Sequence, residues 1–254
     1  MNSTFPSAPL KILAWASDPL LSILYPRSCA SCGQSVERYE LGFCCDSCWR
    51  SSRFFNGEET LCDKCGALLN DFPSASSPSC GRCESHDYDK ARAVGTYDRA
   101  LQSHVIALKS SPHLPGKLKN ELMAAFERTG FANADLIVPV PLSKKRAVER
   151  GHNQAGVIGK YISSRTRLAF DGGSLERTID TPMHRVGMDR KARELTVKNI
   201  FKVARPRIVN GRNIVLIDDV FTSGATAAAC ASVLKKNGAS KVFVFTLARA
   251  VKFN

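Results

Sequence analysis

Apolar runs alternate along this chain with segments whose pattern is typical of helices. The pattern predicts strands at 91–97, 135–140, 213–220 and 241–249, and helices at 98–109, 118–128, 154–164 and 225–234. Strands that alternate with helices indicate a parallel sheet. The sequence therefore predicts an α/β domain that begins near residue 91.

The stretch from Ile214 to Thr226 carries the most informative pattern. Its first four residues are aliphatic and predict a strand that is buried on both faces. Asp218 and Asp219 end that run, and a turn of small, hydroxyl-rich residues leads into an Ala-rich helix. Such a turn offers backbone N–H groups, hydroxyls and the positive end of a helix dipole to an anion, usually phosphate. The acidic pair stands where parallel strands open into a crevice, the usual ligand position in α/β sheets.

A hydroxyl residue before a helix often serves only as a cap. That explanation covers one hydroxyl, but not three around Gly224 together with two adjacent carboxylates. A Walker A loop is excluded because no Gly-Lys-Ser/Thr follows, and the dinucleotide pattern G-x-G-x-x-G is absent. A sugar phosphate fits, because carboxylates accept hydrogen bonds from ribose hydroxyls while the turn holds the 5′-phosphate.

Two basic segments are candidates for contacts with further phosphates. The strand at 135–140 ends in Pro139-Val140-Pro141, and Lys144, Lys145 and Arg146 follow almost at once. A rigid basic turn at a strand's carboxyl end suits pyrophosphate, although a capped helix start with solvated charges also explains the two lysines. The segment 182–193 is basic and poor in large apolar residues. It suits a loop that folds over an anion, but by itself it favours a solvated surface helix.

The composition is that of an ordinary globular protein except for its strongly basic net charge. The chain has 254 residues, 44% of them apolar, and a net charge of +13 from 36 Lys and Arg against 23 Asp and Glu. A basic surface suits phosphorylated ligands or nucleic acid. The alternative is a soluble basic protein whose charge has no binding role. The apolar stretch 9–25 is short and interrupted by Lys11 and Asp18, so we expect an amphipathic helix rather than stable membrane insertion. We expect a cytoplasmic protein.

Nine of the ten cysteines lie between residues 29 and 83. Eight of them form C-x-x-C knuckles, each of which places two thiolates on one turn and supplies half of a tetrahedral site. The knuckles are Cys29/Cys32, Cys45/Cys48, Cys62/Cys65 and Cys80/Cys83. Disulfides are disfavoured because nothing indicates secretion, and ferredoxin clusters use closer spacing. The sequence predicts two structural zinc ions with sequential pairing of the knuckles, crossed pairing being the alternative. Cys44 and Cys230 are expected to pack as small hydrophobes.

The segment around the acidic pair resembles the phosphoribosyl pyrophosphate (PRPP) signature of type I phosphoribosyltransferases. Together with the four knuckles, Pro-Val-Pro-Leu, Arg-Gly-x-Asn-Gln and Arg-Lys-x-Arg, it makes the chain similar to the ComF family over about residues 20 to 250. Three positions depart from the usual family pattern, namely His152 for Phe, His184 for Gln and Thr196 for Asn. These departures concern loop contacts rather than the phosphate turn.

The resemblance implies a type I phosphoribosyltransferase fold preceded by a small double zinc ribbon. We expect an N-terminal segment at 1–25, the ribbon at 26–90 and the phosphoribosyltransferase domain at 91–254. The implied ligands are PRPP or ribose 5-phosphate with Mg²⁺. The implied roles are as follows: Asp218 and Asp219 face the ribose; Thr222, Ser223, Gly224, Ala225 and Thr226 hold the 5′-phosphate; Pro139, Lys144, Arg146 and Arg193 serve the pyrophosphate.

The resemblance also implies a link to DNA uptake, with single-stranded DNA and a competence helicase as candidate partners. Transfer of phosphoribosyl to a nitrogen acceptor is the leading hypothesis for the function. A non-catalytic protein that binds single-stranded DNA through its basic surface and zinc ribbons is the second. A sensor that binds PRPP without turnover is the third. The sequence does not identify the acceptor, since no residue stands out as its base.

Overall fold

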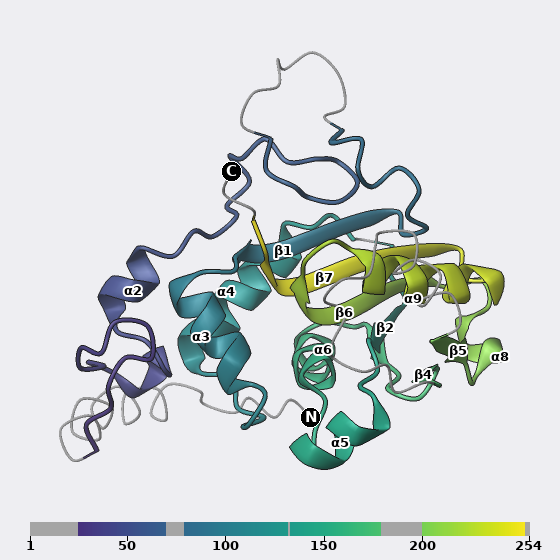
Figure 1. Cartoon of the computed structure of the whole chain (residues 1–254). Coiled ribbons are helices and arrows are strands. Elements are labelled where there is room, and N and C mark those ends of the chain that lie inside the picture. Colours follow the sequence, from purple (N-terminus) through teal and green to yellow (C-terminus); the bar gives the residue numbers. More distant parts are fainter. Residues whose placement is uncertain (1–24, 70–78, 132, 179–199, 252–254) are drawn as a thin grey trace, which may run out of the picture.

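A computed structural model describes residues 25–69, 79–131, 133–178 and 200–251 of the chain. Its centre is a five-stranded, wholly parallel sheet with the strand order β1-β7-β6-β2-β3 (Figure 1). The strands of this sheet are β1 (Lys90–Thr96), β2 (Leu136–Pro139), β3 (Ala169–Phe170), β6 (Asn213–Phe221) and β7 (Lys241–Arg249). The longer helices are α3 (Arg99–Ala107), α4 (Gly116–Glu127), α6 (Gln154–Arg165) and α9 (Ala225–Lys236).

The four strands and four helices predicted from the sequence are all present, with bounds that agree to within a few residues. The expected fold class, a mostly parallel sheet flanked by helices, is confirmed. The structure adds short elements that the pattern did not predict: β3, the antiparallel pair β4 (Leu175–Arg177) and β5 (Phe201–Val203), α5 (Lys144–Arg150), α8 (Pro206–Val209), α2 (Asp46–Arg50) and the 3₁₀ turn η1 (Tyr39–Leu41). These have two to seven residues, too few for a periodic apolar signal.

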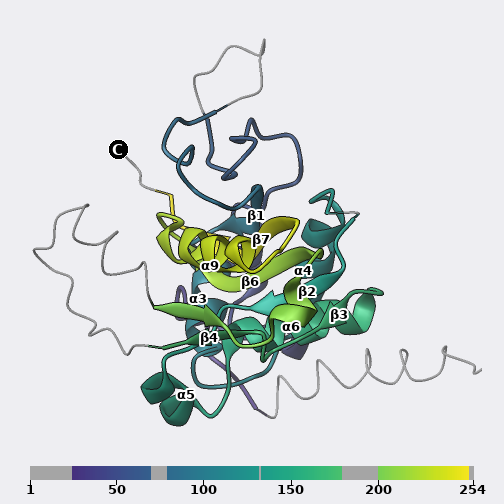
Figure 2. The ribbon, with the colours of Figure 1, turned by 90° about the vertical axis from the view of Figure 1, so that its right-hand side faces the viewer.

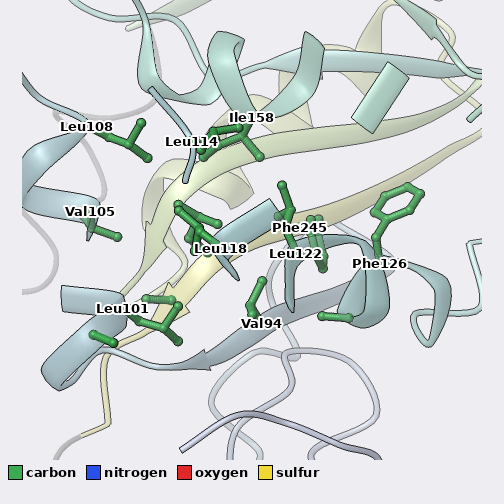
Figure 3. Close-up of a cluster of buried hydrophobic side chains, with 14 of the residues drawn as sticks. Val94, Leu101, Val105, Leu108, Leu114, Leu118, Leu122, Phe126, Ile158 and Phe245 are labelled. Atoms are coloured by element: carbon green, nitrogen blue, oxygen red, sulfur yellow. The ribbon is translucent and has the colours of Figure 1, made fainter. Parts of the chain in front are cut away.

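The central strands are buried on both faces because alternate side chains enter two separate cores. Val215 and Ile217 of β6 join a cluster with α3, α4 and α6, whereas Ile214 and Leu216 join a second cluster with α9. Figure 3 shows the first cluster, in which Leu118 and Leu122 of α4 lie beside Phe245 of β7. A continuous aliphatic run is therefore what this strand needs.

The cysteine-rich segment is packed against the sheet on both sides of its β1 edge. Between the two pairs of knuckles, the chain runs antiparallel to β1: Phe55 N donates to Val94 O at 2.9 Å and Thr96 N donates to Arg53 O at 2.9 Å. The first pair of knuckles belongs to the core on the α3 side and the second pair to the core on the α9 side. Figures 1 and 2 show the second pair's segment above β1, and Figure 1 shows α2 beside α3. The domain boundary near residue 90 stays a prediction.

His104 of α3 locks the first pair of knuckles onto the helices. It is 1% exposed, its Nδ1 lies 2.6 Å from Ala100 O, and its Nε2 accepts from Phe43 N at 3.2 Å. Burial lowers the pKa of His104, so the neutral ring can donate at one nitrogen and accept at the other. The buried Trp49 ring lies 4.9 Å from it, centroid to centroid.

The N-terminal segment 1–25 lies outside the described residues except for its last residue, Tyr25. Within the described ranges, no helix combines the length and the apolar character needed to cross a lipid bilayer.

We predict that Gly95→Ala destabilises the protein by roughly 1–3 kcal/mol through overpacking. A Cβ at this position of β1 would lie 2.3 Å from Arg53 O and 2.8 Å from Leu101 Cδ1, so the antiparallel segment would have to move. Gly156→Ala in α6 is the matched control, because its Cβ would meet Asn153 Cβ at 3.5 Å and would gain helix propensity. Denaturant unfolding should give opposite signs for the two variants; equal effects would contradict the assigned packing.

Candidate functional site

The eight knuckle cysteines form two groups, and in each group the four ligand atoms all lie within 4.8 Å of one another. The groups are Cys29, Cys32, Cys45 and Cys48, and Cys62, Cys65, Cys80 and Cys83. Sulfur–sulfur distances are 3.6 Å for Cys32 to Cys45 and 3.5 Å for Cys65 to Cys80. A tetrahedral zinc with bonds near 2.3 Å holds its sulfurs about 3.8 Å apart, so both groups fit zinc with four thiolates and no open position. The pairing is sequential, as expected.

The two remaining cysteines lie outside these groups. Cys44 and Cys230 are both fully buried, and burial raises the pKa of the Cys44 thiol to about 12. Each therefore packs as a small hydrophobe, as the sequence indicates. Cys230 faces the core beneath the phosphate turn, where burial and the nearby Asp218 charge raise the pKa of its thiol.

The acidic pair lies near the carboxyl end of β6, the middle strand of the sheet. Asp218 is paired in register with Thr246 of β7, and Ile217 with Pro139 of β2. The chain leaves β2 through α6 toward β3 and leaves β6 through α9 toward β7, on opposite faces. The boundary between β2 and β6 is therefore the topological switch point, at which α/β sheets bind ligands.

Asp218 is half-buried, and Asp219 N donates to its Oδ1 at 2.9 Å. Burial, followed by the charge of Asp219, raises the pKa of Asp218 to about 8. Two carboxylates that repel each other in a partly desolvated site destabilise the ligand-free protein. Such an arrangement is typical of a binding or catalytic site.

The turn after β6 presents hydroxyls and amides to solvent. Gly224 has a φ of 80°, which favours glycine, and it forms the N-cap of α9. Thr222, Ser223 and Thr226 are exposed, and Ser223 Oγ lies 3.4 Å from Ala225 N. The first intrahelical bond runs from Ala228 N to Gly224 O at 2.8 Å, so the amides before Ala228 lie in the helix's first turn. This geometry can cradle an anion.

A small hollow joins the acidic strand to the turn. It has a volume of about 20 Å³, and its lining includes Asp218, Thr222, Gly224, Thr226 and, from β7, Thr246. One carboxylate and the turn thus face a common space, which has room for about one water molecule. Binding of a ribose phosphate at these residues stays a prediction. Thr246 is fully buried and the sequence analysis did not identify it.

The predicted pyrophosphate residues are placed only in part. Pro139 ends β2 beside the acidic strand, and Ser143 caps α5 by accepting from Arg146 N at 3.4 Å. A capped helix start is therefore present, and contact of this segment with pyrophosphate stays a prediction. Lys144 is exposed and Arg146 half-buried. Arg193, His184 and the rest of the basic segment 182–193 lie outside the described residues.

The Arg-Gly-His-Asn-Gln segment fastens α6 to this edge of the sheet. Asn153 Nδ2 donates to Val140 O at 2.9 Å, and its Oδ1 accepts from Ala155 N. His152 has ring nitrogens 2.8 Å from Arg150 O and 2.7 Å from Leu108 O, so it connects this loop to the C-terminal end of α3. Gln154 is 2% exposed, and its Nε2 lacks a hydrogen-bond partner within the described part of the chain.

The fold and its sites define a class: an α/β protein with an acidic pair and a hydroxyl-rich turn at the switch point, and with two four-cysteine zinc centres. Residues 20–84 match the family model of the double zinc ribbon domain. The chain is 32% identical to the DNA utilization protein YhgH of Escherichia coli (strain K12), over 82% of this chain and 90% of that protein. The chain therefore belongs to the ComF family of competence and DNA utilization proteins, as its motifs indicated.

More distant relatives carry competence names. The competence protein ComFC of Bacillus subtilis (strain 168) is 26% identical over 81% of this chain and 90% of that protein. Competence protein F of Haemophilus influenzae is also 26% identical, over 87% of this chain and 96% of that protein. Among solved structures, a glutamine PRPP amidotransferase from B. subtilis aligns with a TM-score of 0.35 at 18% identity, covering 53% of this chain and 28% of that chain.

We predict two zinc ions per chain by elemental analysis after gel filtration. Cys32→Ser should reduce the content to one, because three thiolates hold structural zinc poorly. Cys44→Ala is the matched control and should retain two, since Cys44 adjoins the second knuckle without belonging to a site. A zinc ion lost from the Cys44 variant alone would overturn the ligand assignment.

We predict that Asp218→Asn stabilises the protein, and that the gain grows as pH rises from about 4 to about 8. The folded pKa lies above the unfolded one, so the wild-type protein resists ionisation of this group and loses stability across that interval. At pH 8 the gain should be on the order of a few kcal/mol. Thermal unfolding at several pH values measures it, with the exposed Glu127→Gln as control; a gain independent of pH would contradict the assignment.

Proposed function

We propose that this protein binds PRPP with Mg²⁺ and transfers its phosphoribosyl group to a nitrogen nucleophile. The observation that carries the proposal is that Asp218, at the carboxyl end of β6, and the turn at the N-terminus of α9 line one hollow. A sugar phosphate needs both features at this spacing. The PRPP signature that the sequence resembles supports the same assignment.

Asp218 and Asp219 would accept hydrogen bonds from the vicinal ribose hydroxyls, and the turn from Thr222 to Thr226 would hold the 5′-phosphate. The first amides of α9 and the helix dipole favour a dianion there. Because both ends of the ribose phosphate are held by one strand–turn–helix unit, the anomeric carbon is fixed relative to the sheet. Fixing that carbon is what an in-line displacement requires.

The departing pyrophosphate would lie against the basic residues that follow β2. Lys144, Arg146 and Arg193 would take up the charge that develops on it, with Pro139 shaping the strand end. Mg²⁺ prefers oxygen ligands and keeps several waters, so pyrophosphate and ribose oxygens would be its main ligands. Asp218 and Asp219 offer carboxylate oxygens of the kind that Mg²⁺ prefers. When bound, the ion would neutralise part of the pyrophosphate charge.

The bond changes are simple. The C1′–O bond to pyrophosphate breaks with its electron pair on the leaving oxygen, and the nitrogen lone pair forms the new C1′–N bond. The sugar carries positive, oxocarbenium-like charge between the two events. Asp218 and Asp219 would balance that charge from the ribose side, which is the electrostatic part of the catalysis.

The family membership supports a link of the proposed activity to DNA utilization or competence, and nucleotide salvage is the alternative that we propose. A competence helicase is a candidate partner in that context. The eight zinc-binding thiols require a reducing compartment, which supports a cytoplasmic location.

A second function, binding of single-stranded DNA without catalysis, is favoured by a different surface. A groove of about 440 Å³ is lined by Phe170 of β3 and by Arg205 and Arg212 on either side of α8. An aromatic ring with guanidinium groups suits stacked bases and a phosphate backbone. The net charge of +13 points the same way.

Pyrophosphate release with PRPP and Mg²⁺, measured across a panel of purine, pyrimidine and amine acceptors, tests the proposal. Asp218→Asn/Asp219→Asn should lower release by roughly 100-fold or more, because both charges that balance the transition state are lost. Glu58→Gln/Glu59→Gln removes an adjacent acidic pair from a loop of the zinc segment and should leave release unchanged.

The same assay separates the two functions. If no acceptor gives pyrophosphate release and the protein binds single-stranded DNA in a salt-sensitive manner, the result would contradict the transferase activity. It would favour a non-catalytic DNA-binding protein. If the protein binds PRPP but neither releases pyrophosphate nor binds DNA, the result would favour a sensor that binds PRPP without turnover.

A further inference from the structure

One arginine joins the second zinc site to the carboxyl end of β7. Arg249, the last residue of that strand, donates from Nη1 to Cys65 O at 2.6 Å, and its Nη2 lies 3.6 Å from Cys65 Sγ. Four thiolates around one divalent ion leave the site with a net negative charge, so a guanidinium beside a ligand sulfur stabilises the metal-bound form. The same charge holds the guanidinium in place most firmly when the metal is bound.

The guanidinium of Arg249 also packs on the ring of Phe221. Its Cζ lies 4.6 Å from the ring centroid, and the two residues are paired in register on β7 and β6. From another direction Tyr88 meets this ring edge-on, with centroids 5.9 Å apart. Tyr88 is 1% exposed and follows the zinc ligand Cys83 in the sequence. The ring of Phe221 is therefore held by two groups that contact or belong to the second zinc segment.

Phe221 in turn supports the turn formed by residues 222–226. A Cβ built on Gly224 would lie 2.7 Å from Phe221 Cζ and 3.2 Å from its Cε1, so the ring lies directly against the N-cap of α9. Phe221 also lines the hollow that Asp218 and the turn share. A shift of this ring would displace the N-cap, and with it the first amides of α9.

The first zinc site is connected to a different part of the molecule. Phe43, in its segment, donates from N to His104 of α3, and its cysteines belong to the core on the α3 side of the sheet. Phe221 and the buried residues of α9 belong to the other core, together with Cys62, Cys65 and Cys83. The second site, rather than the first, shares a core with the turn.

We propose that Arg249 is a positioning residue that couples the second zinc site to the turn of residues 222–226, so that zinc at this site raises the turn's affinity for a phosphate monoester. The inference rests on the proposed function, because it takes the 5′-phosphate of a ribose phosphate as the ligand. The coupling runs from Cys65 through Arg249 and Phe221 to Gly224. Coupling between two binding sites is reciprocal, so a bound ribose phosphate must also hold the second zinc ion more tightly.

Calorimetry of ribose 5-phosphate binding to the full, zinc-loaded chain tests the first half of this coupling. Arg249→Met keeps an unbranched side chain but removes the donors and the charge, and it should weaken binding by about 5-fold or more, the lower end of ordinary coupling between sites. Arg99→Met is the matched control, because this exposed arginine donates to Ser51 Oγ in the first zinc segment. It should bind like wild type, and both variants should retain two zinc ions.

Transfer of zinc to a chromogenic chelator tests the reciprocal half, which a merely structural role of Arg249 would not produce. Saturating ribose 5-phosphate should slow release of the second ion from the wild-type chain by a similar factor and leave release of the first ion unchanged. Cys32→Ser, which is expected to hold only the second ion, assigns the two phases. In Arg249→Met the ligand should lose most of its effect on zinc release.

The outcomes separate the coupling from the proposed function. Wild-type binding of ribose 5-phosphate without slower release of the second ion would overturn the coupling and leave the proposed function standing, and this result needs no variant. Equal affinity in Arg249→Met and wild type would overturn the role of Arg249 in the same way. Failure of the wild-type chain to bind ribose 5-phosphate or PRPP with Mg²⁺ would overturn the proposed function, and this inference with it.

Discussion

The parallel pairing of β6 with β2 on one side and β7 on the other is the constraint on which the rest of the structure depends. It sets Ile217 against Pro139 and Asp218 against Thr246. The carboxyl ends of three strands thereby meet at one edge, with helices leaving toward opposite faces. This register places the acidic pair and the turn after β6 at the same edge of the sheet as the end of β2. A shift by one residue would exchange the core and site positions of Ile217 and Asp218.

The zinc centres extend this arrangement beyond the sheet. The strand-like stretch at residues 53–55 covers the β1 edge, and the two pairs of knuckles close over opposite faces. Zinc binding contributes on the order of 10 kcal/mol per site, so each centre can hold its segment in place without a large core of its own. Zinc binding at the second site thus also stabilises the segment around His86, which packs against Gly224.

Much of this could be predicted from the sequence because it is local. The C-x-x-C spacing determines which sulfurs share a turn, and the run from Ile214 to Asp219 carries its own strand and site signals. The contact of His86 with Gly224 could not be predicted, since the two residues are 138 positions apart in the sequence. They meet only because the zinc segment packs on the sheet. Helix α5 was only one of two interpretations of its segment, because none of its residues is buried and the sequence therefore has no apolar period there. The place of Arg193 stays a prediction, because it lies outside the described residues.

The central claim is that one strand–turn–helix unit holds a ribose phosphate. A crystal structure of the zinc-loaded protein with PRPP and Mg²⁺ tests it most directly. The account predicts the 5′-phosphate on the amides at the start of α9, with the ribose hydroxyls on Asp218 and Asp219. A ligand bound elsewhere, or a turn that stays empty at millimolar PRPP, would contradict it.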